Sequence, residues 1–194
     1  MKKGQNTRFT ILQKAFEISY QKGYQATSVD DIIHFTTVTK GSFFYHFKSK
    51  DEMGLAMINE VMFPGMRQAL IKPLEKKDTS KALLFKMMKS ILLEDPNFDP
   101  RYGCPAVNII EEMAPINQHF NKAIGKLIDE LLSKIESVIV LGIKNGEIDK
   151  NIKPKQAAHF IISGYMGIRT LGKLYGTKCY DIYLKELKNY INSL

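Results

Sequence analysis

The sequence has few of the features that mark secreted, membrane-spanning or metal-binding proteins. Among its 194 residues are two cysteines, Cys104 and Cys179, which are too few and too far apart for a disulfide framework. No stretch approaches the roughly 18 consecutive apolar residues that a membrane span needs. The polar start of the chain has no apolar signal segment, so we expect a cytosolic protein with no membrane partner. The four histidines show no metal-ligand spacing with each other or with cysteine, which predicts that the protein binds no metal.

Two further patterns are missing. The alternation of apolar and polar residues that marks β-strands is absent, whereas helical periodicity runs through nearly the whole chain. The sequence also has no paired nucleophile and base, no metal cluster and no phosphate-binding loop. We therefore predict an all-α protein that is not an enzyme and has no cofactor. An enzyme that uses an apolar cavity stays open as a rival, and a turnover assay on any tightly bound small molecule would distinguish it.

Positive charge is concentrated at the start of the chain, whose formal net charge is +8. Residues 1–50 carry eight lysine or arginine residues against three carboxylates, which leaves +5 there and +3 on the remaining 144 residues. A basic segment on a nearly balanced body is typical of a module that binds nucleic acid. A basic surface that serves only solubility would have the same charge, so charge alone does not distinguish it from a nucleic-acid-binding module.

Capping residues and helix breakers divide the chain into helices. A first helix ends at Gly23, and short helices are expected over about 28–35 and 39–47. A long fourth helix starts at Ser49 and is expected to kink or break at Pro64-Gly65. Later helices are expected over about 79–94, 104–114, 117–144, 154–175 and 180–192.

The segment from Ser28 to Phe47 suits a helix-turn-helix, whose second helix enters the major groove of DNA. Residues 39–42 would form the first turn of that helix, with short side chains and outward backbone N–H groups that attract phosphate. Phe43 and Phe47 are four residues apart and can anchor the helix in the core. The alternative is a small helical bundle with no role on DNA.

The spaced residues of this segment resemble the TetR family of bacterial regulators. The matching positions cover about the first quarter of the chain and are Thr7-Arg8, Ile11-Leu12, Ala15, Lys22-Gly23-Tyr24, Ala26-Thr27-Ser28-Val29, Ile32, Val38-Thr39-Lys40-Gly41-Ser42 and Tyr45-His46-Phe47-Lys48-Ser49-Lys50-Asp51-Glu52. The resemblance implies a helix-turn-helix DNA-binding domain over residues 1–48 and a helical ligand-binding and dimerisation domain over residues 49–194. Most members of that family are repressors that a small molecule releases from DNA.

The motif also predicts which residues contact DNA. The expected contact residues are Thr27, Ser28, Thr39, Lys40, Gly41, Ser42, Phe44, Tyr45, His46 and Lys50. The sequence has Thr36-Thr37 where the family usually has Ala-Gly, so the tight turn must form without glycine. Phe44 stands where a DNA-contacting tyrosine is common, which removes one hydroxyl group. Tyr45 could instead pack against the domain.

The last two helices predict a homodimer. The helix from Pro154 has apolar groups on more than one side, and the last helix has an apolar stripe. The stripe consists of Leu184, Leu187, Ile191 and Leu194. Across a two-fold axis these helices would form a four-helix bundle, and the paired heads would read a palindromic operator in double-stranded DNA. The alternative is that the stripe lies in the core of a single chain.

A pocket for an unknown small-molecule effector is expected among soft apolar and aromatic side chains that a few polar groups interrupt. The expected ligand-binding residues are Met66, Phe85, Met88, Tyr102, Cys104, Asn108, Glu111, Phe120, Tyr165, Arg169 and Lys173. Because methionines and aromatic residues at helical spacing are usually core residues, a filled core is the alternative, with Arg169 and Glu111 as an ion pair.

A narrower resemblance concerns Cys104. The stretches Tyr102-Gly103-Cys104 and Gly167-Ile168-Arg169-Thr170-Leu171-Gly172-Lys173, with Asn108 and Glu111, resemble a TetR subgroup that includes repressors responding to N-ethylmaleimide, bleach and reactive aldehydes. In that subgroup the cysteine that matches Cys104 is the sensor, and a lysine that matches Lys173 can be its partner. A helix N-terminus and an ammonium group both stabilise a thiolate. A packed, inert Cys104 stays open as the alternative.

The sequence therefore predicts a sequence-specific DNA-binding transcriptional regulator. We expect a repressor that a small molecule or a reactive electrophile releases, because an effector that favours the wrong spacing of the heads opposes DNA binding. A transcriptional activator of the same fold is one alternative. A nucleoid-type protein that binds DNA without sequence preference is another, and competition with unrelated DNA would separate it.

Overall fold

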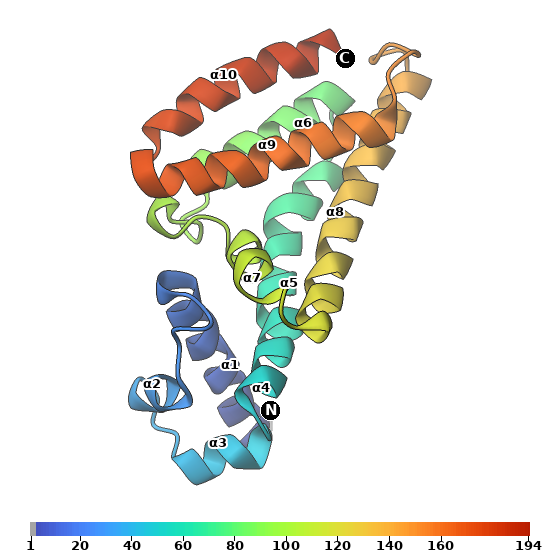
Figure 1. Ribbon diagram of the computed structural model, residues 1–194. Coiled ribbons are helices and arrows are strands. Elements are labelled where there is room, and N and C mark those ends of the chain that lie inside the picture. Colours follow the sequence, from blue (N-terminus) through green and yellow to red (C-terminus); the bar gives the residue numbers. More distant parts are fainter. Residues whose placement is uncertain (1–2) are drawn as a thin grey trace. The chain divides into compact units, whose positions relative to one another are not determined.

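The computed structural model describes residues 3–194, with side chains from Thr7 onward, so residues 1 and 2 of the polar, basic start lie outside it. Every regular element in this range is helical, which confirms the all-α prediction (Figure 1). The α-helices are α1 (Lys3–Lys22), α2 (Val29–His34), α3 (Lys40–His46), α4 (Lys50–Met57), α5 (Phe63–Met66), α6 (Ser80–Lys89), α7 (Pro105–Met113), α8 (Gln118–Lys144), α9 (Pro154–Tyr175) and α10 (Lys178–Ser193). Across residues 3–194, none of these helices combines the length and the apolar character that a membrane crossing requires.

The helices form two compact units. The first unit comprises the chain up to Gly65 together with Pro105–Lys126, and the second comprises Met66–Cys104 together with Leu127–Leu194. The first unit therefore contains α1 to α4 and also α7 and the start of α8. That residues 1–48 form a separate DNA-binding domain stays a prediction.

The core of the first unit is formed by apolar side chains from its three N-terminal helices. Ile11 and Leu12 of α1, Ile32 of α2 and Phe43 of α3 are completely buried. Phe47, which ends α3, packs against Phe43 with ring centroids 5.7 Å apart. These aromatic anchors fix the inner face of α3 and leave its other face outside the core, as the four-residue spacing predicted.

Tyr24 is buried in the first unit and joins the turn after α1 to α4 and to the start of α8. Its hydroxyl donates to the carbonyl of Lys50 at 2.9 Å and to Asp51 Oδ1 at 3.1 Å, and its ring lies 5.1 Å from that of Phe120 in α8. Gly54 of α4 passes so close that a Cβ atom there would lie 2.4 Å from the hydroxyl oxygen. Burial raises the pKa of Tyr24, so the hydroxyl stays a protonated donor.

The long fourth helix runs through Pro64 without a break. α5 contains Pro64 and Gly65 and is flanked by π-helical turns at Ile58–Met62 and Arg67–Ile71. Proline lacks the amide N–H and crowds the carbonyl four residues earlier, and the wider π-helical turn relieves that contact. The expected disturbance is therefore present, but as changes of helical pitch on either side of Pro64 and not as a break.

The second unit packs α10 against α9 and α6, and the three helices lie side by side (Figure 1). The stripe of Leu184, Leu187, Ile191 and Leu194 is buried within this single chain. The prediction that this stripe forms a seam between two chains is therefore wrong. An apolar stripe indicates which face of a helix is covered, but intramolecular and intermolecular cover leave the same pattern.

Gly172 of α9 has no room for a side chain, because a Cβ atom there would lie 2.2 Å from the Tyr180 hydroxyl oxygen. Tyr180 is completely buried and accepts a hydrogen bond from Arg169 Nη1 at 3.2 Å. We predict that Gly172→Ala displaces Tyr180 and lowers the free energy of unfolding by about 1–3 kcal/mol, as overpacking does. Chemical denaturation measures the change.

Gly125→Ala in α8 is the matched control, because nothing in the described chain lies within 4 Å of its Cβ position. That variant should gain up to about 1 kcal/mol from the higher helix propensity of alanine. Equal stability of the two variants would contradict the packing of Tyr180 on Gly172.

Candidate nucleic-acid interface

The turn between α2 and α3 forms without glycine. Thr36 replaces it with side-chain hydrogen bonds: its hydroxyl donates to the carbonyl of Ile33 at 3.2 Å and accepts from the backbone N–H of Val38 at 3.3 Å. Among the described residues, only glycines have a positive φ. The turn contains no glycine, so none of its residues has a positive φ. The Thr36-Thr37 departure from the family pattern is thus compatible with a helix-turn-helix.

Short polar side chains begin both helices of this motif, as predicted. Ser28 caps α2 through its hydroxyl, which accepts from Asp31 N at 3.0 Å, while Asp31 Oδ2 accepts from Ser28 N at 2.7 Å. The ion pair with Lys22, together with these bonds from Ser28, lowers the pKa of Asp31. Thr39 caps α3, accepting from Ser42 N at 3.2 Å. Local sequence thus fixes where each helix begins.

Most of the residues expected to contact DNA are exposed or half-exposed. The exposed members are Ser28, Thr39, Lys40, Gly41, Phe44 and Tyr45, and the half-exposed members are Ser42, His46 and Lys50. Tyr45 is 84% exposed, so it does not pack against the domain. The exposed part of α3 therefore combines small polar groups, two aromatic rings and positive charge.

Thr27 differs from the other expected contacts. Its side chain is completely buried, and its hydroxyl donates to the carbonyl of Gly23 at 2.7 Å. The structure gives Thr27 a role inside the turn between α1 and α2, so we remove it from the candidate DNA contacts. Its position next to the capping residue Ser28 did not reveal this burial.

Lys50 is engaged within the chain. Its ammonium group donates to the carbonyl of Gln25 at 3.2 Å and lies 4.5 Å from the centre of the Tyr24 ring. Burial lowers the pKa of Lys50, although nearby Asp51 and Glu112 act in the opposite direction. Lys50 therefore ties α4 to the turn before α2, a role that its place in the motif did not indicate.

The expected ligand-binding residues are divided between the two compact units. Asn108, Glu111 and Phe120 belong to the first unit, and Met66, Phe85, Met88, Tyr102, Cys104, Tyr165, Arg169 and Lys173 to the second. Glu111 is exposed, and Phe120 is completely buried against Tyr24. These two side chains therefore give no support to a shared ligand pocket.

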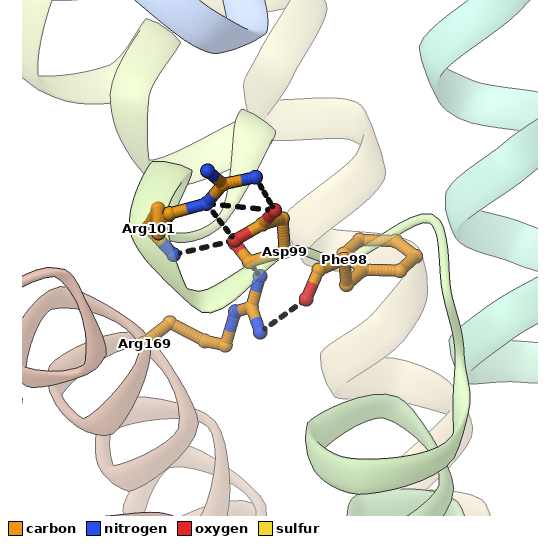
Figure 2. A network of polar contacts seen from close by, with 4 residues as sticks. All are labelled: Phe98, Asp99, Arg101 and Arg169. Atoms are coloured by element: carbon orange, nitrogen blue, oxygen red, sulfur yellow. Dashed lines mark hydrogen bonds and ion pairs between the residues drawn. The ribbon is translucent and has the colours of Figure 1, made fainter. Parts of the chain in front are cut away.

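Arg169 is a completely buried cation in the second unit. Its guanidinium group donates to the carbonyl of Phe98 at 3.0 Å (Figure 2). It also donates to the carbonyls of Asp99, at 3.4 Å, and Gly103. The Asp99 carboxylate pairs with Arg101 at 2.7 Å, and this contact lowers the pKa of Asp99. Carbonyl dipoles at the two terminal nitrogens thus stabilise the buried charge, and Arg169 fastens the loop before α7 to α9.

Cys104 follows this loop and directly precedes α7. Its side chain is buried, and the hydroxyl of Tyr165 lies 3.5 Å from its sulfur. Gly103 has a φ of +68°, and the Lys173 side chain crosses it so closely that a Cβ atom would lie 2.4 Å from Lys173 Cε. The structure thus places Tyr165 in contact with the Cys104 thiol, and Lys173 against Gly103, the residue before Cys104.

A small cavity in the first unit lies elsewhere. It has a volume of about 230 Å³, including the part open to solvent. It is lined by Phe16, Ser19, Tyr20, Met57, Met62, Pro105, Asn108 and Ile109. Of this lining, Asn108 was among the expected ligand-binding residues.

Comparisons with known proteins agree with this architecture. The family model of bacterial regulatory proteins of the tetR family matches residues 11–57, and the model of the tetracyclin repressor-like C-terminal domain matches residues 84–182. The chain is 32% identical, over 87% of its length and 84% of the relative's, to an uncharacterized HTH-type transcriptional regulator from Lactococcus lactis. It is 23% identical, over 81% of its length and 77% of the relative's, to the HTH-type transcriptional repressor DhaR from Mycobacterium sp..

A solved structure shows the same fold. The transcriptional regulator of the TetR family from Cytophaga hutchinsonii superposes with a TM-score of 0.89 over 100% of this chain and 97% of that one, at 22% identity. At this identity the likeness concerns the fold alone. The two family models and the Lactococcus relative concern the sequence as well, and together they show that the chain belongs to the tetR family of bacterial regulatory proteins.

Proposed function

We propose that this DNA-binding transcriptional regulator reads its operator with the outer face of α3 and acts as a repressor that a small-molecule effector releases. The observation that carries the proposal is the exposed polar turn at residues 39–42, backed by the buried anchors Phe43 and Phe47. Short side chains on a rigidly anchored helix can approach base edges in the major groove. The relative DhaR is a transcriptional repressor, which favours repression over activation.

The existing partners of each basic side chain indicate which of them can bind DNA phosphates. Arg8 forms an ion pair with Glu60, and Lys50 is held by Gln25 and Tyr24, so neither ammonium nor guanidinium is displayed freely. Lys48 is exposed, and Lys40 has a surface pair with Asp30 at 3.0 Å. Because exposed ion pairs are weak, Lys40 can exchange its partner for a phosphate. We assign phosphate contact to Lys48 and base or phosphate contact to Lys40.

Salt dependence tests this assignment on a duplex that the unmodified protein selects from random DNA. Lys48→Ala should weaken binding to the selected and to unrelated duplexes by the same factor, and reduce the salt slope by about one unit. Lys40→Ala should instead change which sequences are preferred. Lys144→Ala, an exposed lysine of the second unit, is the control and should change neither. Affinity and slope that stay unchanged in both test variants would refute the interface.

A second copy of the chain is the partner proposed for α9. Large apolar side chains stay exposed along one face of this helix at Phe160, Leu171 and Leu174. Gly167 lies on the same face, and nothing in the described chain lies within 4 Å of its Cβ position. An exposed apolar face with a small residue at its centre suits close approach of a second helix. Two heads joined in this way would read the two halves of a palindromic operator.

Leu174→Asp tests this dimer without disturbing the core, because Leu174 is 75% exposed in the single chain. We predict monomers at micromolar concentration, since a carboxylate buried at an interface without a partner costs several kcal/mol. Sedimentation velocity reads the oligomeric state. Ile116→Asp, at a residue that is 69% exposed in the first unit, should stay dimeric. A monomeric parent protein would refute the proposal.

Cys104 is the candidate for sensing an electrophilic effector. N-ethylmaleimide would add across its double bond: Cys104 Sγ bonds to one alkene carbon and a proton is gained by the other. The added group exceeds the space beside Tyr165, because Cys104 is 2% exposed. Modification would therefore displace the loop that Arg169 fastens, or its junction with α7, and bias the protein away from DNA.

Stoichiometric N-ethylmaleimide should release the selected duplex from the parent protein but not from Cys104→Ser, as a binding assay after labelling would show. Cys179 is the internal comparison, since it is half-exposed and burial raises the pKa of its thiol. Mass spectrometry establishes which cysteine is modified. If fully modified Cys104 leaves DNA binding intact, or if Cys104 resists modification in the folded protein, it is a packed core residue.

A further inference from the structure

The turn between α1 and α2 holds a carboxylate from α7. The backbone N–H groups of Tyr24 and Gln25 donate to the two carboxylate oxygens of Glu112, at 3.2 Å to Oε1 and 2.8 Å to Oε2. The Gln25 side-chain amide returns a hydrogen bond to the backbone carbonyl of Glu112 at 2.9 Å. Three hydrogen bonds therefore join the last turn of α7 to the turn at Tyr24, which lies 88 residues before Glu112 in the chain.

The geometry of this turn is that of an anion-binding site. Gly23 has a φ of +94°, a conformation that would be strained in a residue with a side chain. The next two N–H groups, of Tyr24 and Gln25, then point to the same side. Glu112 fills the space in front of them, since a Cβ atom on Gly23 would lie 3.0 Å from Glu112 Oε1. Hydrogen bonds from backbone N–H groups to a carboxylate are charge-assisted and stronger than neutral ones.

The turn leads directly into the helices that would contact DNA. Ser28, the capping residue of α2, is three residues beyond Gln25, and Thr27 N donates to the carbonyl of Tyr24 at 3.1 Å. Lys50 donates to the carbonyl of Gln25 from the first turn of α4. A displacement of Glu112 would therefore release the N–H groups of the turn that leads into α2, while the apolar anchors of α3 stay in place.

The other end of α7 is joined to the loop of the second unit that Arg169 fastens, because Pro105 follows Cys104 in the chain. α7 is a single helix of nine residues, and a helix transmits a shift of one end to the other because its hydrogen-bonded turns are stiff. Any ligand or modification that moves its first residue also acts on Glu112.

We propose that Glu112 is a positioning residue for DNA recognition: its carboxylate fixes the turn that aims α2 and α3, and its withdrawal is the step by which α7 lowers operator affinity. This inference rests on the proposed function, since it assumes that α2 and α3 contact DNA. In this role Glu112 acts through the turn and need not touch DNA or an effector.

Glu112→Ala and Glu112→Gln test the role on the full-length protein with the selected duplex. The first removes both acceptors, and the second keeps one acceptor and loses the charge. We expect affinity to fall about tenfold or more in Glu112→Ala and less in Glu112→Gln, given the strength of hydrogen bonds to charged groups. Glu111→Ala is the matched control, because Glu111 is the neighbouring residue of the same helix and its side chain is exposed. It should bind as the parent does.

Two readouts separate positioning from a general loss of stability. Amide hydrogen exchange should lose protection at Tyr24 and Gln25 in Glu112→Ala while the α1 core keeps it. Added formate should occupy the vacated N–H groups and recover part of the protection and of the affinity, whereas chloride at equal ionic strength should not. A purely structural defect would leave the fully folded fraction with normal affinity and without rescue by formate.

The outcomes distinguish the two levels of the account. If the parent protein selects no sequence from random DNA, the proposed function fails. If the parent selects a duplex and Glu112→Ala binds it as Glu111→Ala does, the positioning role fails alone. Loss of affinity with unchanged exchange at Tyr24 and Gln25, or without rescue by formate, also overturns it.

Discussion

The burial of Tyr24 is the interaction on which the first unit depends. Its ring lies on Gly54 and against Phe120, its hydroxyl is bound by the first turn of α4, and the Lys50 ammonium covers its ring. These contacts bring the turn after α1, the start of α4 and the start of α8 to one point. The N–H groups of this turn also donate to the Glu112 carboxylate. The helices that would contact DNA are therefore oriented by contacts far from their own exposed face.

Buried polar groups connect the second unit in a comparable way. Arg169 places a cation in the core, and carbonyl groups of the loop before α7 stabilise it. An unsatisfied buried charge would be costly, so this loop is held closely to α9. Cys104 lies at the end of the fastened loop and Glu112 eight residues further along. α7 therefore begins directly after the loop that Arg169 holds and ends at the carboxylate that the turn before α2 holds.

The local features of this structure could be predicted from the sequence, whereas the long-range ones could not. Ser28, Thr39 and Ser49 cap helices through residues three positions away, so their roles are readable from spacing. The burial of Thr27 and the hold of Lys50 on Gln25 depend on segments distant in the chain. The same is true of Glu112, whose neighbour Glu111 has the same chemistry and an exposed side chain. Helical periodicity also identified the Leu187 stripe but not what covers it.

Site-specific crosslinking tests the central claim most directly. Tyr45 of α3 and Tyr175 of α9 are both exposed tyrosines, so each can be replaced by photoreactive benzoylphenylalanine with little change to the core. We expect the probe at position 45 to crosslink to the selected DNA duplex and the probe at position 175 not to do so. A protein that binds the duplex with the probe at position 45 but forms no crosslink to it there would contradict the assignment of α3 as the reading helix.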